Sequence, residues 1–174
     1  MGEPGDEGPA GLVEAAIQGD RAAFGKLHGL YARMVHGVLI SRVPVVEADD
    51  LLQEVFLLAW QKLDSLDDPV AFGGWIAAIA RRCAADFLRR RRTTVALPEE
   101  IAQARRPSVE AQEVLEIIRN LPPAYSETLA MRLVEGMTGP EIAAQTGLTP
   151  ASVRVNLHRG MKLLRERIGV EAGR

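Results

Sequence analysis

The fold is decided by MTGPEIAAQTG at residues 137–147 and by LTPASVRVNLHRGMKLLRER, which follows at residues 148–167. Together these stretches predict two short helices around a tight turn. Thr138 can cap the first helix, because Glu141 three residues later can reach back and complete a capping box. Gly147 then supplies the residue type that a sharp turn tolerates best.

The second helix of this pair has an apolar side and a basic side. Thr149 is expected to cap it, and Pro150 suits its first position. Steps of three and four predict an inward stripe of Val153, Leu157, Met161, Leu164 and Ile168. The other faces hold most of the polar residues: Ser152, Arg154, Asn156, His158, Arg159, Lys162 and Arg165. This pattern predicts a helix-turn-helix whose second helix enters the DNA major groove. The alternative is an ordinary amphipathic helix with a solvated charged face.

Charge is unevenly distributed along the 174 residues, although the net charge is only −2. Residues 1–80 carry 5 Lys and Arg against 12 Asp and Glu, whereas residues 81–92 carry 6 Arg against Asp86 alone. Residues 93–135 carry 4 basic against 7 acidic residues, and residues 136–174 carry 6 against 3. Each of the two basic segments can therefore meet nucleic-acid phosphate.

Composition restricts the class of protein and its compartment. Residues 1–11 have no periodicity and predict a disordered leader, without the basic and apolar parts of a signal peptide. Apolar runs stay well short of the ~18 residues of a membrane span, so no membrane insertion is expected. The single Cys83 excludes an internal disulfide and a cysteine-based zinc site, and it fits a reducing cytoplasm. No cofactor or metal is expected, and Cys83 is either a small core residue or a redox sensor.

The first 92 residues predict a helical domain, which we place at residues 12–92. Helical periodicity runs from Leu12 to about Ile40, with a break at Gly19-Asp20, and a second helix over 48–63 is apolar on a broad front. A third helix, over about 74–92, ends in RRCAADFLRRRR. Its outward positions are expected to hold Arg81, Arg82, Asp86, Arg89 and Arg90. Basic residues suit a helix C-terminus, but six arginines exceed that need and favour nucleic-acid contact.

The rest of the chain predicts a second helical domain. Residues 93–108 lose periodicity and predict a flexible linker. Residues 109–169 predict one helix that stops at Pro122-Pro123, a second over about 126–134, and the helix-turn-helix, before a tail at 170–174. Since no β pattern occurs, the fold class is all-α, with two small helical domains joined by a flexible linker.

The motifs in this order resemble those of the extracytoplasmic-function (ECF) group of sigma factors of bacterial RNA polymerase. ADDLLQEVFLLAWQKL resembles region 2.2, which binds core polymerase, and Trp75–Arg92 resembles the segments that melt and read the −10 promoter element. LPPAYSETLAMRLVEGMTGPEIAAQTGLTPASVRVNLHRGMKLLRERI resembles region 4, which reads the −35 element. The resemblance therefore makes 12–92 region 2 and 109–169 region 4, and it implies control by an anti-sigma factor.

The resemblance also implies three sets of site residues. Docking on the polymerase β′ coiled coil is expected to use Asp49, Asp50, Gln53, Glu54 and Leu57, while region 4 meets the β flap. Contact with the −10 strand is expected from Trp75, Arg81, Arg82, Asp86, Arg89 and Arg90, beside a pocket wall supplied by the loop 66–74. Contact with −35 DNA is expected from Ser152, Arg154, Val155, Asn156, His158, Arg159 and Lys162.

Three positions depart from the family pattern. Arg82 stands where Asn is common, and Ala151-Ser152-Val153 opens the recognition helix in place of a small residue followed by Thr-Val. Gly160 replaces a common Ala, which is expected to weaken that helix by up to ~1 kcal/mol.

Other classes of function fit the residues less well. A sigma-like decoy that binds only an anti-sigma factor would have no use for the arginines at 89–92. A conventional repressor would not need the segment 75–92. For an enzyme, the histidines His28, His36 and His158 are scattered, and Cys83 has no evident base.

Overall fold

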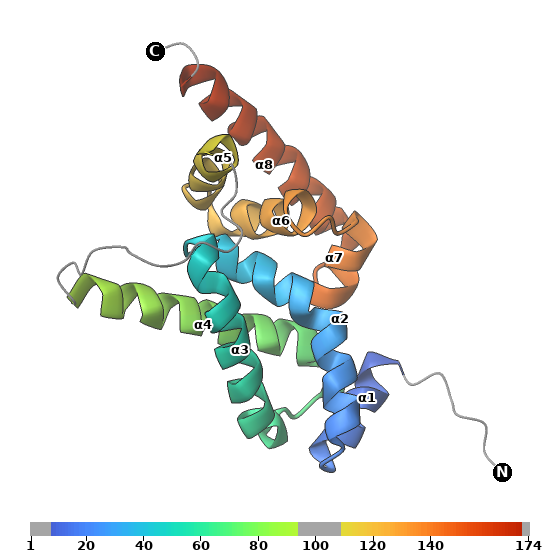
Figure 1. The fold of residues 1–174 in the computed structure, drawn as a ribbon. Coiled ribbons are helices and arrows are strands. Elements are labelled where there is room, and N and C mark those ends of the chain that lie inside the picture. The colour runs from blue at the N-terminus through green and yellow to red at the C-terminus, as the bar shows by residue number, and fades with distance from the viewer. Residues whose placement is uncertain (1–7, 94–108, 172–174) are drawn as a thin grey trace.

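The computed structural model describes residues 8–93 and 109–171, and all regular structure in those ranges is helical (Figure 1). The helices are α1 Pro9–Ile17, α2 Arg21–Ile40, α3 Val45–Lys62, η1 Leu63–Ser65, η2 Pro69–Ala71, α4 Phe72–Thr93, α5 Val109–Arg119, α6 Pro123–Leu133, α7 Gly139–Thr146 and α8 Pro150–Glu171. Residues 94–108 of the predicted linker and most of the predicted leader lie outside the described residues, whereas Thr93, the first residue of the predicted linker, ends α4. Among those described, no helix is long and apolar enough to cross a membrane.

The N-terminal domain, α1 to α4, is built around α2. Helix α1 begins at Pro9 rather than at Leu12, because proline suits a first helical turn and Leu12 is already buried in the core. The predicted break lies at Gly19, whose φ is 94°. Asp20 then caps α2, and its Oδ1 accepts hydrogen bonds from the backbone N–H groups of Ala22 (2.8 Å) and Ala23 (3.1 Å).

The C-terminal domain, α5 to α8, contains the predicted helix-turn-helix. Thr138 and Glu141 form the capping box, and Gly147 ends α7 with a φ of 74°. Thr149 accepts the backbone N–H of Ser152 at 3.1 Å, as a cap of α8 should. Val153 and Leu164 are buried as predicted, and Leu157 and Met161 are half-buried.

Ile168 does not belong to the inward stripe. Its exposed fraction is 39%, so the prediction for this residue was wrong. The reason is geometric: Figure 1 shows the last turns of α8 running past α5 and α6, where no neighbouring helix covers them.

The two domains pack against each other, which the sequence did not predict. Helix α6 lies on α2, and α7 lies beside the start of α4 (Figure 1). Met131 and Ile142 of the C-terminal domain belong to the same buried apolar cluster as the core of the N-terminal domain. Two glycines allow this approach. A Cβ on Gly37 would lie 2.7 Å from Cγ of Met131, and one on Gly73 would lie 1.8 Å from the backbone oxygen of Gln145.

Gly160 has a packing role that the sequence did not reveal. It is buried, and a Cβ there would lie 3.0 Å from Cδ1 of Leu129 and 3.2 Å from Cβ of Tyr125. Glycine therefore lets α8 approach α6 closely.

We expect Gly160→Ala to destabilise the C-terminal domain by about 1 kcal/mol. The substitution improves helix propensity by up to ~1 kcal/mol, but it overpacks a core whose Leu129 is fully buried, at a cost of about 1–3 kcal/mol. Urea unfolding measures the difference. Gly169→Ala is the matched control, since Gly169 lies in the same helix with no atom within 4 Å of its Cβ position, and it should not destabilise. Stabilisation of both variants would contradict the packing role.

Candidate nucleic-acid interface

The outer face of α3 carries the residues expected to contact polymerase. Asp49, Asp50, Gln53 and Leu57 are exposed, and Glu54 is half-buried. Leu57 has an exposed fraction of 58%, which is high for a leucine. This face therefore offers a protein partner one apolar contact with polar side chains around it.

The basic end of α4 projects away from both domains (Figure 1). Arg82, Arg89 and Arg90 are exposed, as predicted. Asp86 is half-buried, and its Oδ1 accepts a hydrogen bond from Nη2 of Arg89 at 2.6 Å. Asp86 therefore orients an arginine.

Arg81 does not point freely outward, so its predicted orientation was wrong. Its side chain is 42% exposed and turns toward the C-terminal domain, where it pairs with Glu127 of α6. The physical reason is the domain packing, which brings a carboxylate to the inner side of α4.

An open pocket lies at the start of α4. Its volume is about 440 Å³, and it is lined by Ser65, Leu66, Asp67, Asp68, Ala71, Gly74 and Trp75. The loop 66–74 therefore does supply a pocket wall. Trp75 is half-buried, with its ring centroid 5.8 Å from that of Phe72, so the indole both packs on the core and borders the pocket.

The outer face of α8 carries the residues expected to read DNA. Six of the seven are exposed: Ser152, Arg154, Val155, His158, Arg159 and Lys162. Asn156 is half-buried, so only part of its side chain faces outward. Farther along α8, a second pocket of about 530 Å³ is lined by Leu157, His158, Met161, Lys162, Arg165 and Glu166. The basic face of the recognition helix thus stays accessible while the domains are packed.

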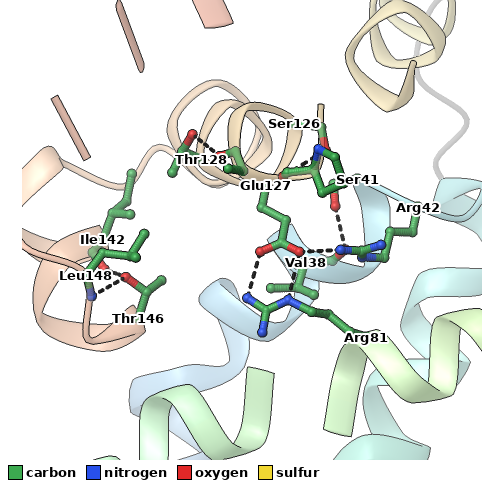
Figure 2. A network of polar contacts seen from close by, with 12 residues as sticks. Val38, Ser41, Arg42, Arg81, Ser126, Glu127, Thr128, Ile142, Thr146 and Leu148 are labelled. Atoms are coloured by element: carbon green, nitrogen blue, oxygen red, sulfur yellow. Dashed lines mark hydrogen bonds and ion pairs between the residues drawn. The ribbon is translucent and has the colours of Figure 1, made fainter. Parts of the chain in front are cut away.

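Two arginines of the N-terminal domain meet one carboxylate of the C-terminal domain (Figure 2). Nε and Nη2 of Arg81 donate to the two oxygens of Glu127 at 2.9 and 2.8 Å, and Nη2 of Arg42 donates to Oε1 at 2.6 Å. Burial raises the pKa of Glu127, but the hydrogen bonds from both arginines outweigh burial and hold that pKa below its ordinary value. Glu127 is therefore ionised at neutral pH.

A histidine forms a second polar contact between the domains. Nδ1 of His36 on α2 lies 2.6 Å from Oε1 of Glu135, and its Nε2 lies 3.7 Å from Oδ1 of Asp49 on α3. The hydrogen bond to Glu135 raises the pKa of His36, burial opposes it, and the charges of Glu135 and Asp49 add to the rise.

We expect this contact to weaken as the pH rises. Because the packed state raises the pKa of His36 above 6.5, it binds the proton more tightly than the unfolded chain does. The stabilisation is complete below the ordinary pKa and is lost as the pH rises through the raised value. In the parent chain, the midpoint of urea unfolding should be lower at about pH 8 than at about pH 6. The decrease between these two pH values should be smaller in the His36→Gln variant. An equal decrease in the parent chain and the variant would contradict the role of His36.

Cys83 is a core residue. It is buried in α4, and burial, followed by the charges of Glu54 and Asp86, raises the pKa of its thiol. Since the thiolate is the reactive form, this environment does not favour redox chemistry.

Sequence reasoning missed residues that join the domains, among them Arg42, His36, Glu127 and Glu135. One signal was present. Ser126, Glu127 and Thr128 form a run of three polar residues in α6, and all three are buried. A buried carboxylate needs a cationic partner, so Glu127 could have been singled out, although not the identity of its partners.

Comparisons with known proteins match both domains. Residues 27–94 match the family described as Sigma-70 region 2, and residues 111–164 match the one described as Sigma-70, region 4. A solved structure of CnrH in complex with the cytosolic domain of CnrY superposes with a TM-score of 0.63 at 23% identity. It covers 93% of this chain and 97% of that chain, which supports the fold.

Curated relatives give the family. The RNA polymerase sigma factor CarQ of Myxococcus xanthus is 30% identical over 90% of this chain and 95% of its own length. The probable RNA polymerase sigma factor RfaY of Xanthomonas campestris is 30% identical, and BldN of Streptomyces coelicolor, an ECF RNA polymerase sigma factor, is 28% identical. Each of these two aligns with 88% of this chain, which spans only 42% of RfaY and 63% of BldN. The chain belongs to the sigma-70 family of RNA polymerase sigma factors, within its ECF group.

Proposed function

We propose that this chain is an alternative sigma factor that docks on core RNA polymerase and directs promoter-specific transcription initiation in the cytoplasm. The observation that supports this most strongly is the joint exposure of three surfaces in the family's order: the α3 face, the pocket and basic end of α4, and the basic face of α8.

We assign −35 recognition to α8. Arg154 lies in its second turn, where a recognition helix contacts base edges, and a bidentate pair with guanine discriminates by ~1–3 kcal/mol. Arg159 and Lys162 lie farther along and suit phosphates, which position the helix without specifying sequence. Val155 and His158 are exposed between them and would adjust promoter choice.

We assign capture of the melted −10 strand to α4 and the pocket at its start. An unstacked base needs a concave site with a ring or an apolar wall, while basic side chains follow the strand. Trp75 and Leu66 offer such walls, and the carboxylates of Asp67 and Asp68 can accept hydrogen bonds from an exocyclic amino group. Arg82, Arg89 and Arg90 supply the charge.

We assign docking on the β′ coiled coil to the exposed α3 face, with Leu57 as its apolar contact and Asp49, Asp50, Gln53 and Glu54 around it. The C-terminal domain would meet the β flap. Two weak DNA-binding modules held by one polymerase gain from effective concentration, so neither has to bind promoter DNA tightly alone. An anti-sigma factor that covers these surfaces would hold the chain inactive. The solved complex of the sigma factor RpoE with the anti-sigma factor NepR from Bartonella quintana is a precedent in a protein of similar fold, with a TM-score of 0.52 at 21% identity.

In vitro transcription tests the proposal. Purified core polymerase with this chain should give promoter-specific transcripts from genomic fragments. The double variant Arg89→Glu, Arg90→Glu should give at least about tenfold less promoter-specific transcript, because each charge reversal removes a phosphate contact and adds repulsion. Arg21→Glu with Arg167→Glu is the control, with the same change in net charge at two exposed positions elsewhere. Absence of specific transcripts, or equal losses in both double variants, would contradict the assignment.

A further inference from the structure

Arg42 and Arg81 form an anion cradle between two helices. Arg42 follows the end of α2 and Arg81 lies in the middle of α4, yet both guanidinium groups reach the same carboxylate at 2.6–2.9 Å. Figure 2 shows Glu127 pointing down from α6 between them. The occupant therefore comes from the C-terminal domain, while the cradle belongs entirely to the N-terminal domain.

The carboxylate does not satisfy every donor of the cradle. Nε of Arg42 is buried and has no hydrogen-bond partner. Glu127 already accepts three hydrogen bonds on its two oxygens, and two cations face one anion, so the cluster keeps a net positive charge. A phosphodiester offers four oxygens in a tetrahedral arrangement, and arginine pairs bind such groups in bidentate fashion. The cradle thus has donors to spare for a phosphate.

The place of the cradle suits a nucleic-acid strand. Arg81 lies six residues after Trp75 and eight before Arg89 in one helix, about 9 Å and about 12 Å along its axis. It is therefore located between the pocket and the basic end of α4, the two features to which we assign −10 capture.

We propose that Arg42 and Arg81 form a phosphate-binding site for single-stranded promoter DNA, which Glu127 occupies while the two domains are packed together. The inference rests on the proposed function of α4. It adds Arg42 to the DNA-binding residues, and it makes domain packing and strand binding compete for the same two side chains. Strand binding requires Glu127 to leave, so the packed form of the chain binds single-stranded DNA weakly.

Binding of a labelled single-stranded 15-nucleotide DNA of mixed sequence to the full chain tests this competition by fluorescence anisotropy. If about nine-tenths of the molecules are closed, apparent affinity is lowered about tenfold, and Glu127→Gln should restore most of that loss. Glu113→Gln is the matched control, because it removes the same charge from an exposed position of α5. Equal affinities in Glu127→Gln and Glu113→Gln would overturn the proposal.

A second variant tests the cradle itself. Adding Arg42→Gln to Glu127→Gln should abolish the gain in affinity and reduce the salt slope, d log K/d log [salt], by about 0.7, the value for one lost phosphate contact on a single strand. A salt slope that stays the same would show that Arg42 has only a structural role and would overturn its assignment. Circular dichroism confirms that each variant remains helical.

A variant that separates the two domains by steric clash tests the competition independently. Gly73→Ala separates the domains without changing any charge, and it should raise affinity for the same oligonucleotide. If the parent chain directs transcription but neither Glu127→Gln nor Gly73→Ala binds the oligonucleotide more tightly, the proposed competition is refuted and the proposed function is not. A chain that gives no promoter-specific transcripts refutes the proposed function, whatever the oligonucleotide does.

Discussion

Gly73→Ala is expected to force the two domains apart. The added Cβ would lie 1.8 Å from the backbone oxygen of Gln145 and 3.2 Å from Cε1 of Tyr31. A backbone oxygen cannot move aside like the tip of a side chain, so α7 has to leave α4. The cost is about 1–3 kcal/mol of stability, the range for overpacking, and the Arg81–Glu127 contact is lost with it. Small-angle X-ray scattering should show a larger radius of gyration.

The neighbouring glycine gives the matched control for this experiment. A Cβ on Gly74 would meet only the backbone oxygen of Thr146, at 3.9 Å, which is an ordinary contact. Gly74→Ala should therefore leave the scattering profile as it is. If the two variants scatter alike, Gly73 does not govern the packing of the domains.

Leu57→Asp is expected to abolish polymerase binding while leaving the fold intact. Leu57 is 58% exposed, so its replacement disturbs little packing within the chain. At the centre of a docked face the same change buries an unpaired charge, which costs at least ~2 kcal/mol, or about 30-fold in affinity. Titration of labelled core polymerase with the variant measures the loss, and urea unfolding checks that stability is unchanged.

Leu30→Asp is the control for Leu57→Asp. Leu30 is also an exposed leucine of the N-terminal domain, but it lies on α2, outside the face assigned to polymerase. The Leu30→Asp variant should bind core polymerase with the affinity of the parent chain. Equal losses in the two variants would mean that the affinity does not depend on the α3 face.

Local signals in the sequence predicted most of the helices and both ends of α7. The capping box of Thr138 and Glu141 and the positive φ of Gly147 depend on residues within a few positions of one another, so a short stretch determines them. The exposed face of α8 followed from periodicity for the same reason, whereas the exposed face of α3 was expected from the family resemblance. At the free end of α8, at Ile168, periodicity predicted burial that no neighbouring helix provides, and Leu133 at the end of α6, also expected inside, is 47% exposed.

Contacts between the domains could not be predicted, because they join residues far apart in the chain. His36 and Glu135 are separated by 99 positions, and Arg42 and Glu127 by 85. The periodicity of apolar and polar residues in the sequence indicates neither pair. The role of Gly160 was also hidden, since a glycine within a helix indicates weak propensity and not the proximity of Leu129.

Permanganate footprinting of promoter DNA tests the central claim most directly, which is that two cationic surfaces open a promoter only when core polymerase holds them. Reactive thymines mark melted DNA around the −10 element. We predict reactivity with the chain and core polymerase together, and none with either alone. Reactive thymines with the chain alone, or none when the chain and core polymerase are together, would contradict the account.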